Sequence, residues 1–555
     1  MGRLTCFFLL SVFFLTSCRS AKPNGFSTDE VIRHSHLVKS LDVGYEALLT
    51  RIELIRSARK EVMIQTFIWA EDEIGVLMFY ELLHAAERGV RVRIIADQMF
   101  SLGNVEWLAY AAKAHPNLSI RLYNPNSNRL SSSLLRSLTG LALNFKQYNS
   151  RMHNKVFVAD GCAITGGRNI ENCYYDYAET LNFKDRDVLV KGPVVDRMRA
   201  SFNAYWHFPL VVPAVELTDV SRAVKECRLK KLKSPEDFGI SKVWEKVDTD
   251  LSCSQVCKRI TTFSHKVEQV AFFADPPGKN DASGYTGSSQ LNETIVNYLK
   301  AADESIQIQS PYLVMSSRAM GLFSAIRDKS SKIKVSFSTN SLAATDSWQT
   351  YALFYKQKKQ ILDDLNCNVY EYKPLPENIK AVMPNYTKPL KDVYYKDAQY
   401  LCLHAKTLII DNEISFIGSY NLDPRSANLN TEVELVVWDK DFAKAVSNNI
   451  KEDCRPENSW VSWKKRRVIG LKQIDDLMTS LSGVVQYVTT LDLWPTAHAA
   501  CFELRENGII TDCHDKDFYK NYKDVGNFPM LSTTNDKVIL VNLFRSIGQG
   551  LKPLL

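Results

Sequence analysis

The sequence has few features that would set it apart from ordinary globular proteins. Beyond its first residues, no apolar run in the 555-residue chain is as long as a membrane-spanning helix. No tract has the composition of a disordered segment. The formal net charge is only +7, which favours anionic partners such as nucleic acid or acidic lipid but does not choose between them. The length and the 45% apolar share allow two or three domains with a large core.

A regular cysteine framework is also missing. The 12 cysteines have irregular spacing. Cys253 and Cys257 are four residues apart, but no second cysteine pair or histidine pair stands nearby. This pattern does not favour a zinc site, and we predict neither a metal nor another cofactor.

The N-terminus resembles the export signal of a bacterial lipoprotein. Arg3 precedes an apolar run from Leu4 to Leu15, and Thr16-Ser17-Cys18 follows. The ending LTSC resembles a lipobox, in which the signal is cut and the cysteine is lipidated. We therefore predict a signal peptide over 1–17, lipidation of Cys18 and a tether over 18–39. This places the protein on a membrane of the bacterial cell envelope, facing the periplasm; the alternative is an ordinary secretory signal with Cys18 incidental.

Two parts of the chain repeat the same order of predicted elements. Strand-like runs at 62–69 and 90–97 flank a segment with helical spacing that ends at Gly89. In the second half, predicted strands at 305–314 and 333–341 enclose a short helix in the same way. Strand, helix, strand implies parallel pairs with crossover helices. The sequence therefore predicts an α/β fold of two similar lobes.

Each half ends this pattern with the spacing His-x-Lys-x4-Asp. The two sets are His153, Lys155 and Asp160, then His404, Lys406 and Asp411. In an extended strand, side chains two residues apart point to one face, so each histidine should share a cleft with its lysine. Each aspartate begins a predicted turn, which favours a structural role for both.

Two copies of this motif can provide both a nucleophile and an acid, whereas one copy can provide only one of them. If the halves pack with two-fold symmetry, one histidine attacks a phosphorus atom and the other protonates the leaving oxygen. Two lysines stabilise the charge on the phosphate oxygens, so the mechanism needs no metal.

These segments resemble the duplicated signature of the phospholipase D superfamily. The resemblance runs from about Ser40 to Asp453 and implies two lobes, each a mixed sheet flanked by helices, related by pseudo-two-fold symmetry. It implies a first lobe over 40–213, a connection over 214–264, and a second lobe over 265–455.

The resemblance also implies roles for particular residues. His153 would be the nucleophile, Asn169 and Asn421 would bind the substrate phosphate with the two lysines, and Asp160 and Asp411 would join the catalytic signature. Carboxylates behind the histidines would fix their tautomers; Asp185 and Glu432 stand at the matching positions, with Asp187 and Glu434 as alternatives.

The substrate class is less determined by the motifs. SPY at 310–312 and TNSLAATD at 339–346 resemble the lipoprotein-type, third class of bacterial cardiolipin synthases. The resemblance implies a phosphatidyltransferase that makes cardiolipin from phosphatidylglycerol and a second phospholipid, either phosphatidylglycerol or phosphatidylethanolamine, through a phosphohistidine intermediate. The alternatives are a phospholipase D hydrolase that releases phosphatidic acid, a nuclease that uses Lys146 and Arg151, and an inactive scaffold.

Two further segments have alternative interpretations. Leucines at 134, 135, 138 and 141 give an apolar helical face, which either contacts acyl chains or packs on the first lobe. The extension over 456–555 begins with two tryptophans and a basic run, which suit either an anionic membrane surface or a solvated helix start.

Overall fold

The computed structural model describes residues 31–98, 104–125, 128–130, 150–226, 232–279, 289–386, 399–466, 498–531 and 535–547. The predicted signal peptide, Cys18, the leucine-bearing segment and the final eight residues lie outside this described part.

The first lobe alternates strands and helices as the sequence predicts, and its turns explain where the strands end. Asp160 has a φ of 47°, which brings the chain from β5 back along β6. Its elements are β1 (Ile32–Leu41), α1 (Gly44–Ser57), β2 (Glu61–Thr66), α2 (Glu73–Glu87), β3 (Arg91–Asp97), α3 (Val105–Ala111), β4 (Leu118–Tyr123), β5 (Val156–Ala159), β6 (Cys162–Gly166), β7 (Leu181–Lys184), β8 (Asp187–Lys191), α6 (Val194–Trp206) and β9 (Val211–Pro213).

The second lobe repeats this order. Asp411 and Asn412 both have positive φ, and they make the corresponding turn between β15 and β16. Its elements are β10 (His265–Ala274), α10 (Gln290–Ala301), β11 (Ser305–Gln309), α11 (Ser317–Lys329), β12 (Lys334–Asn340), α12 (Trp348–Lys359), β13 (Asn368–Tyr372), β14 (Tyr400–Leu403), β15 (Thr407–Ile410), β16 (Ile414–Gly418), α14 (Pro424–Asn428), β17 (Val433–Trp438) and α15 (Lys440–Asp453).

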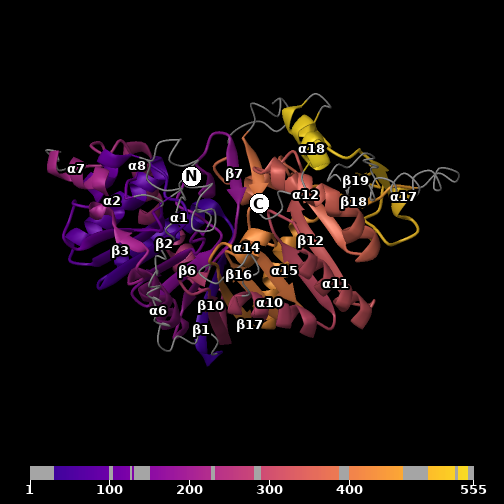
Figure 1. The fold of residues 1–555 in the computed structure, drawn as a ribbon, viewed down its shortest axis with the longest axis horizontal. Helices are drawn as coiled ribbons and strands as arrows, with labels where there is room; N and C mark the ends of the chain where they lie inside the picture. Colours follow the sequence, from indigo (N-terminus) through magenta and orange to yellow (C-terminus); the bar gives the residue numbers. More distant parts are fainter. Residues whose placement is uncertain are drawn as a thin grey trace, which may run out of the picture.

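The strands of both lobes form one continuous mixed sheet. The first lobe contributes the order β9-β4-β3-β2-β5-β6-β8-β1, and the second contributes β10-β17-β16-β15-β11-β12-β13. Antiparallel pairing of β1 with β10 joins the halves, and the order reads the same outward from that junction. The predicted fold class is confirmed. Figure 1 shows the two lobes side by side, indigo to magenta and orange.

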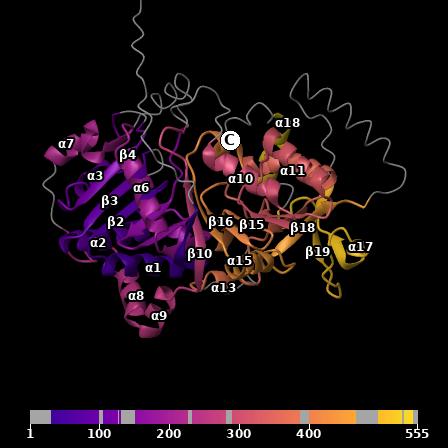
Figure 2. The same ribbon diagram turned by 90° about the horizontal axis from the view of Figure 1, so that it is seen from below.

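Helices cover the sheet in a pattern that also follows the pseudo-two-fold relation. In Figure 2, α1 and α2 lie along the lower side of the first lobe, whereas α10 and α11 lie along the upper side of the second. Val62, Ile64 and Leu77 belong to the apolar core beneath α1 and α2, and Phe202 and Ile450 belong to a core shared by the two lobes. This shared core holds the lobes together at their junction.

Three segments differ from their sequence-based descriptions. The predicted tether is too long, because residues 32–39 form most of β1 inside the sheet. The connection over 214–264 contains α7 (Thr218–Glu226), α8 (Ser241–Ser252) and α9 (Ser254–Thr261), and α8 and α9 pack on α1. Beyond residue 455, β18 (Ser459–Lys464), β19 (Ala499–Leu504) and β20 (Tyr522–Asp524) continue the sheet past β13.

The tryptophans at the start of the C-terminal extension are core residues. Trp460 and Trp463 lie in β18 and are only 3% and 5% exposed. The two interpretations of this cluster, a membrane-surface contact and a solvated helix start, are therefore wrong for both tryptophans. A last helix, α18 (Asp536–Ile547), packs on α12. Within the described ranges, no helix has the length and apolar character needed to cross a bilayer.

Candidate active site

The two histidine segments meet at the junction of the lobes. His153 and Lys155 precede β5, and His404 and Lys406 connect β14 with β15. They occupy short extended connections rather than the strands that the sequence analysis assumed. β7 of the first lobe pairs with β14 of the second in a separate two-stranded sheet, which ties the two connections together.

Each histidine is held by the opposite lobe. His153 donates its backbone N–H to Thr431 O at 3.0 Å, and its Nδ1 lies 2.8 Å from Glu432 Oε2. His404 donates its backbone N–H to Lys184 O at 2.7 Å, and its Nδ1 lies 2.6 Å from Asp185 Oδ2. The carboxylates hold each ring through Nδ1, and Lys406 Nζ lies 3.1 Å from His404 Nε2, so the arrangement is complete only when both lobes are present.

The two carboxylates are held differently. Hydroxyl groups of Ser419 and Ser426 donate to Glu432 at 2.5 and 2.7 Å. Asp185 accepts the backbone N–H of Arg186 at 2.7 Å and lies against Gly167. A Cβ on Gly167 would come within 2.2 Å of Asp185 Oδ1, so only glycine leaves space for this carboxylate.

The lysines are buried beside their histidines. Lys155 Nζ donates to His153 O at 2.8 Å, and Lys406 Nζ donates to His404 O at 2.5 Å. Burial lowers the pKa of both ammonium groups. An anionic phosphate between them would favour their charged forms, so the pair is suited to binding an anion.

The protonation pattern suits a nucleophile and carboxylate supports. Burial lowers the pKa of His153 to about 4, although the nearby Glu432 carboxylate opposes this shift. Burial and the neighbouring Lys406 ammonium lower the pKa of His404. Burial alone would raise the pKa of Asp185, but Lys406 and His404 outweigh it and lower the value to about 2. Neutral imidazoles therefore face ionised carboxylates before substrate binds.

Asn169 and Asn421 occupy equivalent loops but have different partners. Asn169 accepts the Ile68 N–H at 3.2 Å and donates to the Tyr174 hydroxyl at 2.9 Å. Asn421 Oδ1 is buried and makes no hydrogen bond within the described residues. The Tyr174 hydroxyl lies 3.4 Å from His404 Nε2. Tyr174 is a site residue that sequence reasoning missed, because no motif distinguishes it from its neighbour Tyr175.

Asp160 and Asp411 lie at the far ends of the motif strands and organise turns. The Asp160 carboxylate accepts the backbone N–H groups of Arg59, Lys60 and Glu61 at 2.8 to 3.0 Å. Asp411 accepts the corresponding groups of residues 303–305 at 2.7 to 3.0 Å. Within the described residues, both carboxylates bind backbone N–H groups and neither hydrogen-bonds a histidine, so the geometry supports the structural role rather than the catalytic one.

The alternative carboxylates do not reach the histidines either. Asp187 pairs with Arg51 at 2.7 Å and with Arg168 at 3.2 Å. Glu434 accepts the Tyr420 N–H at 3.1 Å, and burial raises its pKa well above the ordinary value. Arg151 is fully buried and pairs with Asp97, so its charge is not offered to a nucleic acid.

Two lobes that cross-support a pair of histidines above two buried lysines define a phospholipase D-type unit. The family model described as the phospholipase D-like domain of cardiolipin synthase matches residues 51–206 and 295–454. The chain belongs to this family, which confirms the predicted resemblance.

Individual relatives agree with this assignment. Cardiolipin synthase C of Escherichia coli (strain K12) is 32% identical over 413 residues, or 74% of this chain and 82% of that protein. An uncharacterized protein of Helicobacter pylori (strain ATCC 700392 / 26695) is 30% identical over 427 residues, 76% and 79% of the two chains. The crystal structure of phosphatidylserine synthase from Haemophilus influenzae Rd KW20 has a TM-score of 0.52 at 16% identity, covering 82% of this chain and 94% of that one. It shares the fold.

Proposed function

We propose that the protein is a phosphatidyltransferase that makes cardiolipin from phosphatidylglycerol and a second phospholipid. The observation that carries the proposal is the crossed pairing of His153 with Glu432 and of His404 with Asp185 above two lysines. The similarity to cardiolipin synthase C supports the lipid substrate.

In the first step, His153 Nε2 attacks the phosphorus of the donor lipid. The bond from phosphorus to the headgroup oxygen breaks, and His404 gives its proton to that oxygen. His404 is therefore the acid of this step, and bound phosphate favours its protonation by opposing the effect of burial. Lys155 and Lys406 stabilise the charge on the phosphate oxygens, and Glu432 stabilises the positive charge that develops on His153.

In the second step, a glycerol hydroxyl of phosphatidylglycerol loses its proton to His404 and attacks the same phosphorus. The bond from phosphorus to His153 breaks, and neutral His153 is regenerated with cardiolipin as the product. If water attacks instead, the same site acts as a phospholipase D and releases phosphatidic acid.

An asymmetry between the histidines supports His153 as the nucleophile. The Tyr174 hydroxyl lies next to His404 Nε2, and burial raises its pKa well above the ordinary value, so it stays protonated. A hydrogen bond at that nitrogen hinders direct attack but suits proton transfer. His153 instead meets the edge of Phe67, with ring centroids 5.0 Å apart, which leaves its Nε2 without that competitor.

We also propose that Cys18 carries a lipid anchor that holds the enzyme on a membrane facing the periplasm. The apolar leader and LTSC sequence support this proposal. Incorporation of labelled palmitate into the wild type but not into Cys18→Ser tests it; equal labelling of both would contradict it.

The catalytic proposal is tested by mass spectrometry of lipid products. Purified protein receives vesicles of phosphatidylglycerol, with and without phosphatidylethanolamine, beside His153→Ala and His404→Ala. His207→Ala is a matched control, because His207 is exposed at the end of α6. We expect cardiolipin from the wild type and the control alone.

Other products would change the proposal. Phosphatidic acid without cardiolipin would replace the transferase with the hydrolase. No lipid turnover by folded protein, together with cleavage of single-stranded DNA, would replace it with the nuclease.

A further inference from the structure

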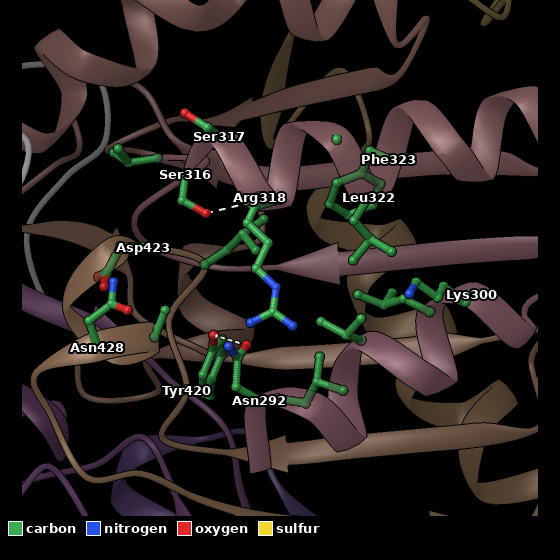
Figure 3. A pocket seen from close by; sticks show the side chains of 18 of the residues that line it. Asn292, Lys300, Ser316, Ser317, Arg318, Leu322, Phe323, Tyr420, Asp423 and Asn428 are labelled. Atoms are coloured by element: carbon green, nitrogen blue, oxygen red, sulfur yellow. Dashed lines mark hydrogen bonds between the residues drawn. The ribbon is translucent and has the colours of Figure 1, made fainter. Parts of the chain in front are cut away.

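The second lobe contains a cavity of about 550 Å³ between α10, α11 and the loop that follows β16. Such a volume is typical of a small-molecule site. Figure 3 shows Arg318 extending into the cavity, opposite Asn292 and Tyr420. Most of the wall is aliphatic or aromatic: Ile295, Val296, Leu299, Val314, Leu322, Phe323 and Leu422.

The corresponding region of the first lobe is a packed core. Asp72 and Ser316 are the N-cap residues of the equivalent helices α2 and α11. Counting from them, Ile74 of the first lobe corresponds to Arg318, and Leu77 corresponds to Gly321. Ile74 and Leu77 are fully buried and fill the core of the first lobe. At the same two positions the second lobe has the exposed Arg318 and Gly321, which leave the space unfilled.

The helix α10 shows this exchange at one position and the reverse exchange at another, where a buried arginine of the first lobe is replaced by an isoleucine. Counting back from the first residues of β2 and β11, Leu48 corresponds to Asn292 and Arg51 to Ile295. In the first lobe, α8 also packs on α1 and α2 and buries Val243 and Val247 completely. The duplication has therefore kept the helices but opened the space between them in one lobe.

The cavity lies beside the loop that carries Asn421 and shares lining residues with a smaller space that Lys406 also lines. Tyr420 and Leu422 line the cavity and flank Asn421 in the loop expected to bind phosphate. The residues that line the smaller space of about 40 Å³ include Ile295, Leu299, Tyr420, Leu422 and Lys406. Apolar surface thus continues from the cavity to one of the two phosphate-binding lysines.

The charged groups at the wall of the cavity are the cations Arg318 and Lys300 and the acid Asp423, whose pKa is raised by burial to about 6. Arg318 pairs with Glu293 at 2.7 Å, and both side chains are about half exposed. Lys300 provides a second cation at the wall. An aliphatic chain in the apolar part would leave its polar end near these cations and near Lys406.

We infer that this cavity binds an acyl chain of the phospholipid whose phosphate occupies the candidate active site. The inference rests on the proposed function and adds that the two lobes are unequal: the second lobe selects the lipid by chain length. Among the described residues of the first lobe, the equivalent positions on α2 are filled by the fully buried Ile74 and Leu77.

Gly321 allows the cavity to be filled without damage to the fold. A Cβ at Gly321 would meet no atom within 4 Å, so a leucine enters open space. Gly321→Leu copies the first lobe, where Leu77 stands, and should strengthen α11 because leucine favours helices over glycine. Gly321→Ala is the matched control, since it strengthens the helix but fills little of the cavity.

The test compares long-chain and short-chain substrates. For Gly321→Leu we expect kcat/KM with dioleoyl phosphatidylglycerol to fall about tenfold or more, while kcat/KM with the dihexanoyl lipid stays within about twofold of wild type. Gly321→Ala should stay within about twofold with both lipids. Equal loss on both lipids, or no loss on either, would overturn the inference.

A second readout does not depend on turnover. A phosphatidylglycerol with a photoreactive diazirine at the end of one acyl chain should label peptides from 290–329 in the wild type and much less in Gly321→Leu. Labelling only elsewhere would overturn the inference. If the wild type turns over neither lipid, the proposed function fails, and the labelling pattern still decides whether the cavity binds a chain.

Discussion

Glu432 of the second lobe supports His153 of the first lobe, and Glu432→Gln tests whether the reaction needs this support. The side chain is fully buried and contacts His153 Nδ1 at 2.8 Å. Glutamine has the same shape, and its amide oxygen can still accept the Nδ1 proton while Ser426 reorients toward the amide nitrogen. The substitution therefore removes charge and changes little else.

The expected loss of kcat/KM depends on the stage of the reaction at which His153 carries a positive charge. His153 is neutral in the free enzyme, because burial lowers its pKa to about 4. It becomes positive only as it bonds to phosphorus. Removing one partner of a buried charge pair costs about 3–5 kcal/mol, and here that cost falls on the transition state. We expect kcat/KM to fall about 10²- to 10⁴-fold with little change in thermal stability.

Glu434→Gln is the matched control. Glu434 is two residues further along and is also buried, burial raises its pKa well above the ordinary value, and its carboxylate accepts the Tyr420 N–H instead of contacting a histidine. Cardiolipin formation with phosphatidylglycerol vesicles, measured beside melting temperature, should show a loss in Glu432→Gln alone. A less than tenfold loss in Glu432→Gln, or equal losses in both variants, would refute the reasoning.

Three further predictions concern the turns, the pH dependence and the glycine beside Asp185. Asp160→Ala should lower the free energy of unfolding by roughly 1–2 kcal/mol, because it removes the carboxylate that accepts three backbone N–H groups and places alanine at positive φ. It should leave kcat of the folded enzyme within a few-fold of wild type, and loss of activity in folded Asp160→Ala would restore the catalytic role of this residue. As the pH falls from 6.5 to about 4, the unfolded chain gains a proton on His153 before the folded chain does, so this residue progressively destabilises the fold. The melting temperature of His153→Gln should fall less steeply over that range than wild type, and parallel curves would contradict the lowered pKa. Gly167→Ser should reduce kcat at least tenfold, because its Cβ would displace the carboxylate that holds His404, whereas Gly161→Ala, whose Cβ meets no atom within 4 Å, should not; similar kinetics for both would show that this displacement does not occur.

The sequence was sufficient for the local parts of this structure. The two hairpins were predictable because Asp160 and Asp411 follow buried strand residues and tolerate positive φ. The parallel crossovers were predictable from the alternation of strand and helix spacing. The family resemblance supplied Asp185 and Glu432, which periodicity alone does not distinguish from Asp187 and Glu434.

Features that depend on tertiary packing were not predictable. Nothing local indicates that Glu432 supports the histidine of the other lobe, since this pairing arises only when Met152 and His153 of the first lobe meet Thr431 of the second. Because a basic run follows them, the tryptophans of β18 suggested a surface segment. They are buried because β18 adds to the sheet between β13 and β19. Residues 32–39 resembled a tether because their burial alternates and depends on partners in β8 and β10.

The division of labour between the histidines is tested most directly by trapping the covalent intermediate. A phosphatidyl ester with a p-nitrophenol leaving group needs little acid assistance, so it should react without His404 and then remain attached because no base activates the acceptor. In His404→Ala, the account predicts a phosphatidyl adduct on His153, found by mass spectrometry of the intact protein and its peptides, and none in His153→Ala. An adduct on His404 in His153→Ala, with none on His153 in His404→Ala, would contradict it.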